Sequence, residues 1–168
     1  LLGGIAGLLQ SLQHSGRIDL PFGLGYYQLL TAHGILMAIV FTTFFIVGFL
    51  IAGVSTVLGG KLTDTSRRLG WAGFWTMVAG CVFVIVPLLR GNASVLYTFY
   101  APMQASPAFY VGLTLVVVGS WFGGFAIFAQ HAAYRRHANV TVTPLFSFMA
   151  VCTMLVWQVA TLGVAAEV

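Results

Sequence analysis

The sequence predicts an all-α fold, a polytopic bundle of transmembrane helices, and three observations indicate it. The chain has 168 residues, of which 60% are hydrophobic and only 6% are charged, whereas a soluble domain carries roughly 25% charged residues. The mean hydropathy is +0.99. Four apolar runs reach the roughly 20 residues that a helix needs to cross a bilayer. We therefore expect lipid rather than water to surround most of the chain.

Four full spans and one partial span are expected. The full spans are placed at residues 27–58, 69–89, 107–133 and 143–165. Residues 1–12 have the apolar character of the last part of an earlier helix, and the chain starts there without an initiator Met. The start of the chain has neither the basic segment nor the cleavage site that mark a signal peptide, so no signal peptide is predicted. Residues 1–168 are therefore expected to be a piece of the transmembrane domain of a longer membrane protein.

The composition excludes a water-soluble enzyme, a nucleic-acid-binding module and a disordered linker. The isoelectric point of about 9.4 is basic, but it rests on seven Lys and Arg residues against three Asp and Glu residues. So few cations cannot form a face that binds a phosphate backbone. We therefore expect no nucleic-acid partner.

The distribution of basic residues predicts the orientation in the membrane. Two connections, at residues 59–68 and 134–142, carry most of the cations, and the opposite side carries few. Cytoplasmic loops are enriched in Lys and Arg, so these two connections are expected in the cytoplasm of a prokaryotic cell, with the protein in the plasma membrane. The five cations of the cytoplasmic side are Lys61, Arg67, Arg68, Arg135 and Arg136, and the two of the outer side are Arg17 and Arg90.

His33 is the most informative residue of the sequence. It follows the expected start of the first full span by about two helical turns. An ionisable side chain at that depth is costly unless it has a partner or a function. A neutral imidazole can give one nitrogen to a metal such as haem iron and the other to a hydrogen bond, and Gly34 leaves space for a flat macrocycle. The alternative is a core histidine that bonds to a neighbouring helix.

The other histidines carry less information. His14 follows the partial span in a polar run and is expected in a solvated loop, although a local bis-histidine site with His33 stays open. His131 and His137 are six positions apart, so they do not share a helical face. Together with the neighbouring arginines they indicate an interfacial anchor.

The remaining reactive residues predict no further site. The acidic residues Asp19, Asp64 and Glu167 fall in connections or at a helix end, so no carboxylate is embedded in a span. Cys81 and Cys152 lie in apolar runs without metal-ligand spacing and are expected to be buried structural thiols. Small residues predict close approach of helices; these are Gly112, Gly119, Gly123 and Gly124.

Two motifs resemble a known family. Residues 25–34 read GYYQLLTAHG and resemble the second helix of subunit I of haem-copper oxygen reductases, where a Thr-x-His-Gly core recurs. Residues 95–102 read VLYTFYAP and look like the family's outer loop between helices three and four, with Ala101 where a proline usually stands. Residues 20–22 together with 26–28, and residues 142–145, are most similar to the B-type, ba3-like branch. The resemblance covers essentially the whole chain, from the end of helix one through helix five.

The resemblance implies a function and its cofactors. The family's subunit I is the catalytic subunit of a terminal respiratory oxidase, which reduces oxygen to water and pumps protons. It holds a low-spin haem, of type b or a, and a binuclear centre of high-spin haem and copper. By this resemblance His33 is an axial ligand of the low-spin haem, and Gly34, Tyr97 and Tyr100 lie near that haem. The family's proton-channel aspartate is not transferred to Asp64, because the surrounding pattern differs.

The resemblance also implies partners and what lies elsewhere. The second axial histidine and the ligands of high-spin haem and copper are expected outside residues 1–168, so the fragment alone is not expected to be active. The implied partners are membrane lipid, oxidase subunit II, and cytochrome c or a similar electron donor.

Three alternatives remain open at this point. A nitric oxide reductase catalytic subunit of the same superfamily would share the haem histidine. A small non-catalytic membrane protein, such as a transporter piece or an assembly factor, would explain the spans without a cofactor. A self-contained b-type cytochrome would use His14 and His33 as its two ligands.

Overall fold

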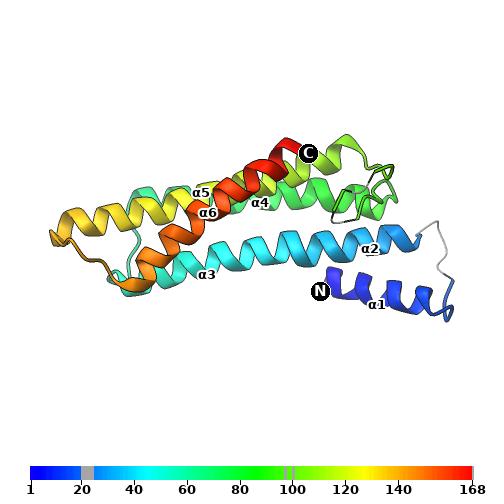
Figure 1. Cartoon of the computed structure of the whole chain (residues 1–168), viewed down its shortest axis with the longest axis horizontal. Helices are drawn as coiled ribbons and strands as arrows, with labels where there is room; N and C mark the ends of the chain where they lie inside the picture. The colour runs from blue at the N-terminus through cyan, green and yellow to red at the C-terminus, as the bar shows by residue number, and fades with distance from the viewer. Residues whose placement is uncertain (20–24, 97, 100, 168) are drawn as a thin grey trace. The chain divides into compact units, whose positions relative to one another are not determined.

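Helices account for nearly all regular structure in the described part of the chain. A computed structural model describes residues 1–19, 25–96, 98–99 and 101–167, with side chains up to residue 163. Figure 1 shows the helices along the chain. They are α1 (Leu2–His14), α2 (Tyr26–Gly34), the π-helix η1 (Ile35–Phe41), α3 (Thr42–Val57), α4 (Asp64–Leu89), α5 (Pro107–Ala138) and α6 (Leu145–Glu167). Among the described residues no strand forms beyond one isolated pair, so the all-α prediction is confirmed.

Four helical stretches are long and apolar enough to cross a membrane, as predicted. They are Tyr26–Val57, Asp64–Leu89, Pro107–Ala138 and Leu145–Gly163. The first combines α2, η1 and α3 without a break. Helix α1 has 13 residues, about 20 Å at 1.5 Å per residue, and is therefore too short to cross the roughly 30 Å hydrocarbon core.

The predicted start of the second span was wrong by five residues, because a polar cap extends the helix. Helix α4 begins at Asp64 rather than at residue 69, so Arg67 belongs to the helix and not to the connection. The Thr63 hydroxyl accepts a hydrogen bond from the Ser66 backbone N–H at 3.3 Å, which satisfies one free donor of the first turn. Asp64 adds a negative charge at the positive end of the helix dipole.

The third span also continues past its predicted end. Helix α5 ends at Ala138 rather than at residue 133, so Arg135 and Arg136 lie in its last turn and not in the following connection. Cations at this position interact favourably with the negative end of the helix dipole. Asn139 then adopts a left-handed conformation with φ of 47°, which ends the helix.

The π-helix η1 follows His33 and Gly34 directly and was not predicted. It covers seven residues, Ile35–Phe41. Most π-helical segments are short insertions in α-helices and are frequent at functional sites. Apolar composition alone could not indicate it, because α- and π-helices place similar demands on side-chain polarity.

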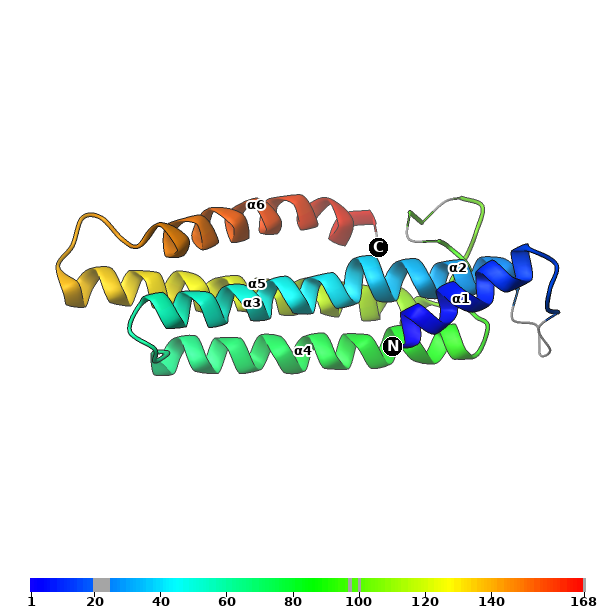
Figure 2. The ribbon, with the colours of Figure 1, turned by 90° about the horizontal axis from the view of Figure 1, so that it is seen from below.

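The contacts divide the chain into two units. In the first unit, residues 1–43 and 80–113, helix α1 packs against α2 and η1. Figures 1 and 2 both show α1 lying beside α2. Gly3 makes this approach possible, because a Cβ at that position would lie 2.8 Å from Met37 Cγ and Sδ.

The second unit, residues 44–79 and 114–168, contains the apolar core. Helix α3 supplies one face of it with side chains spaced three and four residues apart, as expected of an amphipathic helical stripe. The core residues are Val47, Leu50, Val54, Leu58, Met77, Ile127, Ala150 and Met154. Hydrogen bonds add to this packing between α5 and α6: Trp157 Nε1 donates to Ser120 Oγ at 2.9 Å, and Trp121 Nε1 donates to Thr161 Oγ1 at 2.8 Å.

Glycines bring helix backbones together within this second unit, as the sequence predicts. A Cβ at Gly119 of α5 would lie 2.8 Å from the Gly73 carbonyl oxygen of α4 and 2.5 Å from Met77 Cγ. A Cβ at Gly73 would in turn lie 2.6 Å from the Gly119 carbonyl oxygen. The two backbones therefore meet where neither carries a side chain, which is a common way for membrane helices to associate.

We expect Gly119→Ala to lower the thermal stability of the purified membrane protein. The new methyl group would meet backbone, which cannot move aside as a flexible side chain can, and such overpacking typically costs about 1–3 kcal/mol. Gly48→Ala is the matched control, because a Cβ at Gly48 meets no atom within 4 Å. The measurement is the thermal unfolding of both variants in detergent. Equal midpoints for Gly119→Ala and Gly48→Ala would contradict the close α4–α5 contact.

Candidate functional site

The candidate site is centred on His33, one residue before the end of α2. The structure places its ring against α1, where Nδ1 lies 2.9 Å from the Gly3 carbonyl oxygen. The ring is partly buried. The alternative interpretation, a histidine that bonds to a neighbouring helix, therefore holds for Nδ1.

This contact fixes the tautomer of the ring. A carbonyl oxygen can only accept a hydrogen bond, so Nδ1 must carry the proton and donate it. In a neutral imidazole the other nitrogen, Nε2, then has a free lone pair. Within the described part of the chain only Nδ1 of His33 makes a hydrogen bond. Nε2 is therefore the ring nitrogen that could bind a metal.

Gly7 completes the surface against which the ring lies. A Cβ at Gly7 would be 2.6 Å from His33 Nδ1 and 2.8 Å from Cε1, so a methyl group there would overlap the ring. Gly3 and Gly7 are four residues apart on α1 and lie on the same helical face. Helix α1 therefore presents a glycine-lined surface with one backbone acceptor to the imidazole.

The connection between α4 and α5 is hydrogen-bonded to α2 by two polar side chains. The Gln28 side chain accepts from the Gly25 N–H at 3.0 Å and donates to the Gly91 carbonyl oxygen at 2.6 Å. The Thr31 hydroxyl donates to the Tyr27 carbonyl oxygen at 2.7 Å and accepts from the Leu96 N–H at 2.9 Å. Contacts on both α1 and this connection therefore hold the helix that carries His33.

The geometry does not support a shared iron site of His14 and His33. His14 lies eleven residues after Gly3 on α1, about 16 Å along the helix axis, and Gly3 is the residue that contacts His33. The His14 ring instead lies against Tyr26, with centroids 5.3 Å apart. His14 is exposed, as predicted, but it is the last residue of α1 and does not lie in a loop. The self-contained cytochrome with these two ligands is not supported by this geometry.

The other predicted site residues have different positions. Gly34 has helical dihedral angles, φ −61° and ψ −50°, so the backbone itself does not require glycine there. Tyr97 and Tyr100 lie outside the described residues. Their expected place near the haem stays a prediction.

His131 and His137, the predicted interfacial anchor, lie in two different environments. His131 Nδ1 lies 2.8 Å from the hydroxyl of Ser147, which is fully buried on α6. The sequence did not indicate this interhelical partner. His137 is exposed, and its Nδ1 donates to the Ala133 carbonyl oxygen of its own helix at 2.8 Å.

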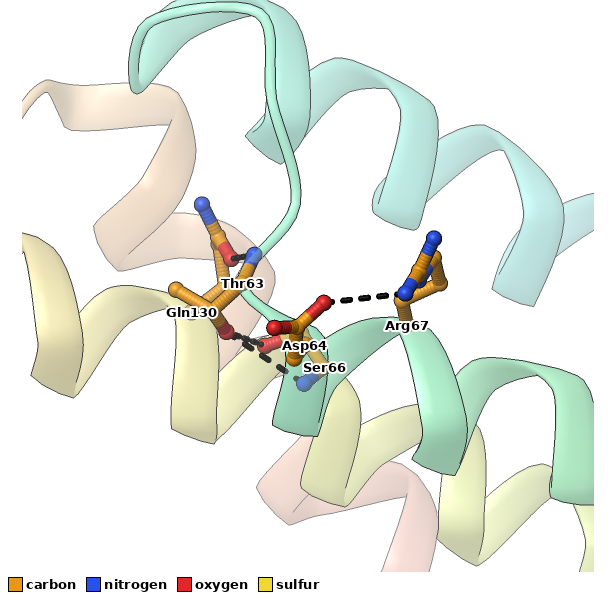
Figure 3. Close-up of polar contacts among 5 residues, drawn as sticks. All are labelled: Thr63, Asp64, Ser66, Arg67 and Gln130. Atoms are coloured by element: carbon orange, nitrogen blue, oxygen red, sulfur yellow. Dashed lines mark hydrogen bonds and ion pairs between the residues drawn. The ribbon is translucent and has the colours of Figure 1, made fainter.

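A second polar cluster lies at the start of α4 and contains no metal-ligand set. Gln130 of α5 is 4% exposed, accepts from the Thr63 N–H at 2.8 Å and donates to the Lys61 carbonyl oxygen at 3.0 Å. Figure 3 shows its side chain reaching the connection that precedes α4. Asp64 pairs with Arg67 at 2.9 Å, and both side chains are largely exposed. This cluster holds a connection in place and leaves Asp64 in a solvated ion pair.

Comparisons with known proteins identify the family of the chain. A sequence model of the family described as "Cytochrome C and Quinol oxidase polypeptide I" matches residues 1–168. The chain belongs to this family. Cytochrome c oxidase subunit 1 of Thermus thermophilus is 34% identical over 177 positions, which cover 99% of this chain and 30% of that protein. Membership of the subunit I family sets aside an unrelated transporter piece or assembly factor.

A solved structure gives the same result for the fold of this subunit I chain. A chain of a heme-copper terminal oxidase dimer, determined by cryo-EM, superposes with a TM-score of 0.88 at 34% identity. The match covers 99% of this chain and 29% of that one. The chain therefore spans about 30% of the length of the relatives it matches.

The contact of α1 with His33 was not predicted from the sequence. Its signal was present, because Gly3 and Gly7 form the Gly-x-x-x-Gly spacing that marks close helix contacts in membranes. Gln28 and Thr31 were also not predicted as anchors of the α4–α5 connection. Their partners are backbone groups more than 60 positions away, and no spacing rule indicates such a contact.

We expect Gln130→Leu to speed amide hydrogen exchange in residues 59–64. The variant removes both hydrogen bonds to the connection, and a net loss of about 1 kcal/mol corresponds to roughly five-fold faster opening. Gln158→Leu is the matched control, because Gln158 donates to the Trp121 carbonyl oxygen instead. Exchange measured by mass spectrometry on the purified protein tests this. Unchanged exchange in Gln130→Leu would contradict the role of Gln130.

Proposed function

We propose that the chain is part of the catalytic subunit of a terminal respiratory oxidase that reduces oxygen to water, and that His33 is an axial ligand of its low-spin haem. The observation that carries this proposal is the hydrogen bond from His33 Nδ1 to the Gly3 carbonyl oxygen. Metal-bound histidines characteristically donate their other ring N–H to a carbonyl or carboxylate, which fixes the ring and raises its basicity as a ligand.

The residues of this chain fit a haem group at that position. Nε2 of His33 has the free lone pair that iron requires, and Gly3 and Gly7 keep the ring in place from the side of α1. Gly34 adds no side chain next to the ligand. When bound, a bis-histidine haem supplies one-electron transfer and has no open iron position for oxygen. The protein supplies the orientation of the ligand and an apolar surrounding that excludes water.

The assignment to the whole oxidase extends the proposal beyond the residues described. Residues 1–168 correspond to the end of helix one through helix five of subunit I. The second axial histidine and the ligands of the high-spin haem and copper belong to the rest of the subunit. The electron donors are subunit II and cytochrome c or a similar protein. The subunit lies in the plasma membrane, pumps protons outward, and has the connections at residues 59–63 and 139–144 on the cytoplasmic side.

Oxygen is the proposed substrate rather than nitric oxide. Both named relatives are oxidases, one a cytochrome c oxidase and one a terminal oxidase. Turnover of the purified complex with reduced donor should consume oxygen rapidly and nitric oxide slowly. The reverse order would assign the chain to the nitric oxide reductases of the same superfamily.

We expect His33→Ala to abolish the low-spin haem signal of the assembled complex, because it removes the axial ligand. His14→Ala is the control and should leave that signal intact, since His14 lies about 16 Å along α1 from the residue that contacts His33. The measurement is the reduced-minus-oxidised optical spectrum together with electron paramagnetic resonance of the oxidised complex. A low-spin signal that persists in His33→Ala would refute the ligand assignment.

Gly7→Ala should disturb the same haem without replacing its ligand. The added methyl group would overlap the His33 ring and push Nδ1 away from Gly3, so the low-spin signal should broaden, shift or be lost in part. Gly4→Ala is the matched control on the same helix, because a Cβ there meets no atom within 4 Å. Identical spectra for Gly7→Ala and wild type would show that α1 does not hold the ring in the assembled complex.

A further inference from the structure

Helix α2 is hydrogen-bonded on two opposite faces. His33 contacts α1. Thr31 precedes it by two residues, a rotation of about 200° around the helix axis, so its side chain lies on nearly the opposite face. Gln28 is three residues before Thr31 and shares that second face. The face with Thr31 and Gln28 contacts the connection between α4 and α5.

The Thr31 hydroxyl acts both as a hydrogen-bond donor and as an acceptor. The side chain is fully buried, donates to the Tyr27 carbonyl oxygen and accepts from the Leu96 N–H. Without the hydroxyl, the Leu96 N–H would lose its partner, and the loss of a buried partner is costly. Leu96 also has a φ of 60°, a left-handed conformation that non-glycine residues rarely adopt. The hydrogen bond therefore gives a partner to a backbone N–H whose residue has a conformation that non-glycine residues rarely adopt.

The segment that Thr31 contacts is itself braced. Ala93 and Ala105 pair as an antiparallel bridge, the Ser94 N–H donates to the Gln104 carbonyl oxygen at 3.3 Å, and the Ser106 N–H donates to the Asn92 carbonyl oxygen at 2.9 Å. Ala93 and Val95, which precede Leu96 in the chain, are buried. Thr31 thus contacts Leu96, two residues beyond the cross-linked part of this connection.

We propose that Thr31 is a positioning residue that sets the rotation of α2 about its axis and thereby the direction of the His33 imidazole. This inference rests on the proposed haem ligation by His33. A helix with side chains is about 10–12 Å wide, so a rotation of about 10° moves a side-chain tip by about 1 Å. A functional group must be held within about 0.5 Å of its productive geometry. With the single hydrogen bond to α1 alone, α2 could rotate about that contact. The contact of Thr31 on the opposite face prevents this rotation.

The test compares Thr31→Val, Thr31→Ser and wild type in the purified haem-loaded complex. Val keeps the shape of Thr but removes the hydroxyl, and Ser keeps the hydroxyl. We expect Thr31→Val to retain the low-spin haem with shifted g-values and a shifted midpoint potential, and to show amide exchange at Leu96 about five-fold faster or more. Thr31→Ser should restore both. Gln28→Leu, which removes the Gly91 contact on the same face, should shift the g-values in the same direction.

Thr76→Val is the matched control. Among the described residues the Thr76 hydroxyl bonds only to the Ala72 carbonyl oxygen of its own helix, so the same substitution should change neither the g-values nor the exchange at Leu96. If the Thr31→Val complex does not assemble, the g-values and midpoint potential of Gln28→Leu are compared with those of Thr31→Ser. Unchanged g-values and potential in an assembled Thr31→Val or Gln28→Leu complex would overturn the positioning role, even if exchange at Leu96 increased.

The outcome for His33 distinguishes the two proposals. A low-spin signal that survives His33→Ala refutes the ligand assignment and the positioning inference with it. Loss of the signal in His33→Ala, together with unchanged spectra in the Thr31 and Gln28 variants, refutes the positioning inference alone.

Discussion

Hydrocarbon offers no hydrogen-bond partner, so a polar side chain inside a membrane helix must find its partner on the protein. Several polar side chains in both units follow this constraint. His33 uses a carbonyl of α1, and Thr31 uses one carbonyl and one N–H. In the second unit, Trp157 donates to Ser120, and Gln130 bonds to the backbone on two sides. Apart from the bond of Thr31 to the Tyr27 carbonyl in its own helix, each of these bonds joins segments that are far apart in sequence, so satisfying the polar groups also fixes the packing.

The fold was predictable because it depends on quantities that act locally. Hydropathy and length set the four spans, and the helices that form agree with them to within a few residues at most ends. The errors arose where polar residues extend helices beyond the apolar core. Thr63 caps α4, and Arg135 and Arg136 complete the last turn of α5. Hydropathy cannot indicate such ends, since the residues that cap a helix resemble the residues of a connection.

The site was predictable only in part. An embedded histidine followed by glycine indicates a functional residue, because burying an ionisable side chain in a membrane is costly without a function. The partners of His33 and Thr31 are main-chain groups of Gly3 and Leu96, and every residue of the chain carries such groups. Sequence patterns cannot select one carbonyl among many. The Gly-x-x-x-Gly spacing of α1 comes nearest to a signal, but it indicates close approach and not what approaches.

The identity of the His33 acceptor has a genetic consequence. The oxygen belongs to the main chain at Gly3, so no substitution at position 3 deletes it, and a change there can only alter the crowding around Met37. Under the proposed haem ligation, a screen for lost function would therefore recover the histidine readily and its partner rarely. Drift at position 3 is limited by volume and not by chemistry, so the hydrogen bond can persist through sequence change that would erase a bond between two side chains.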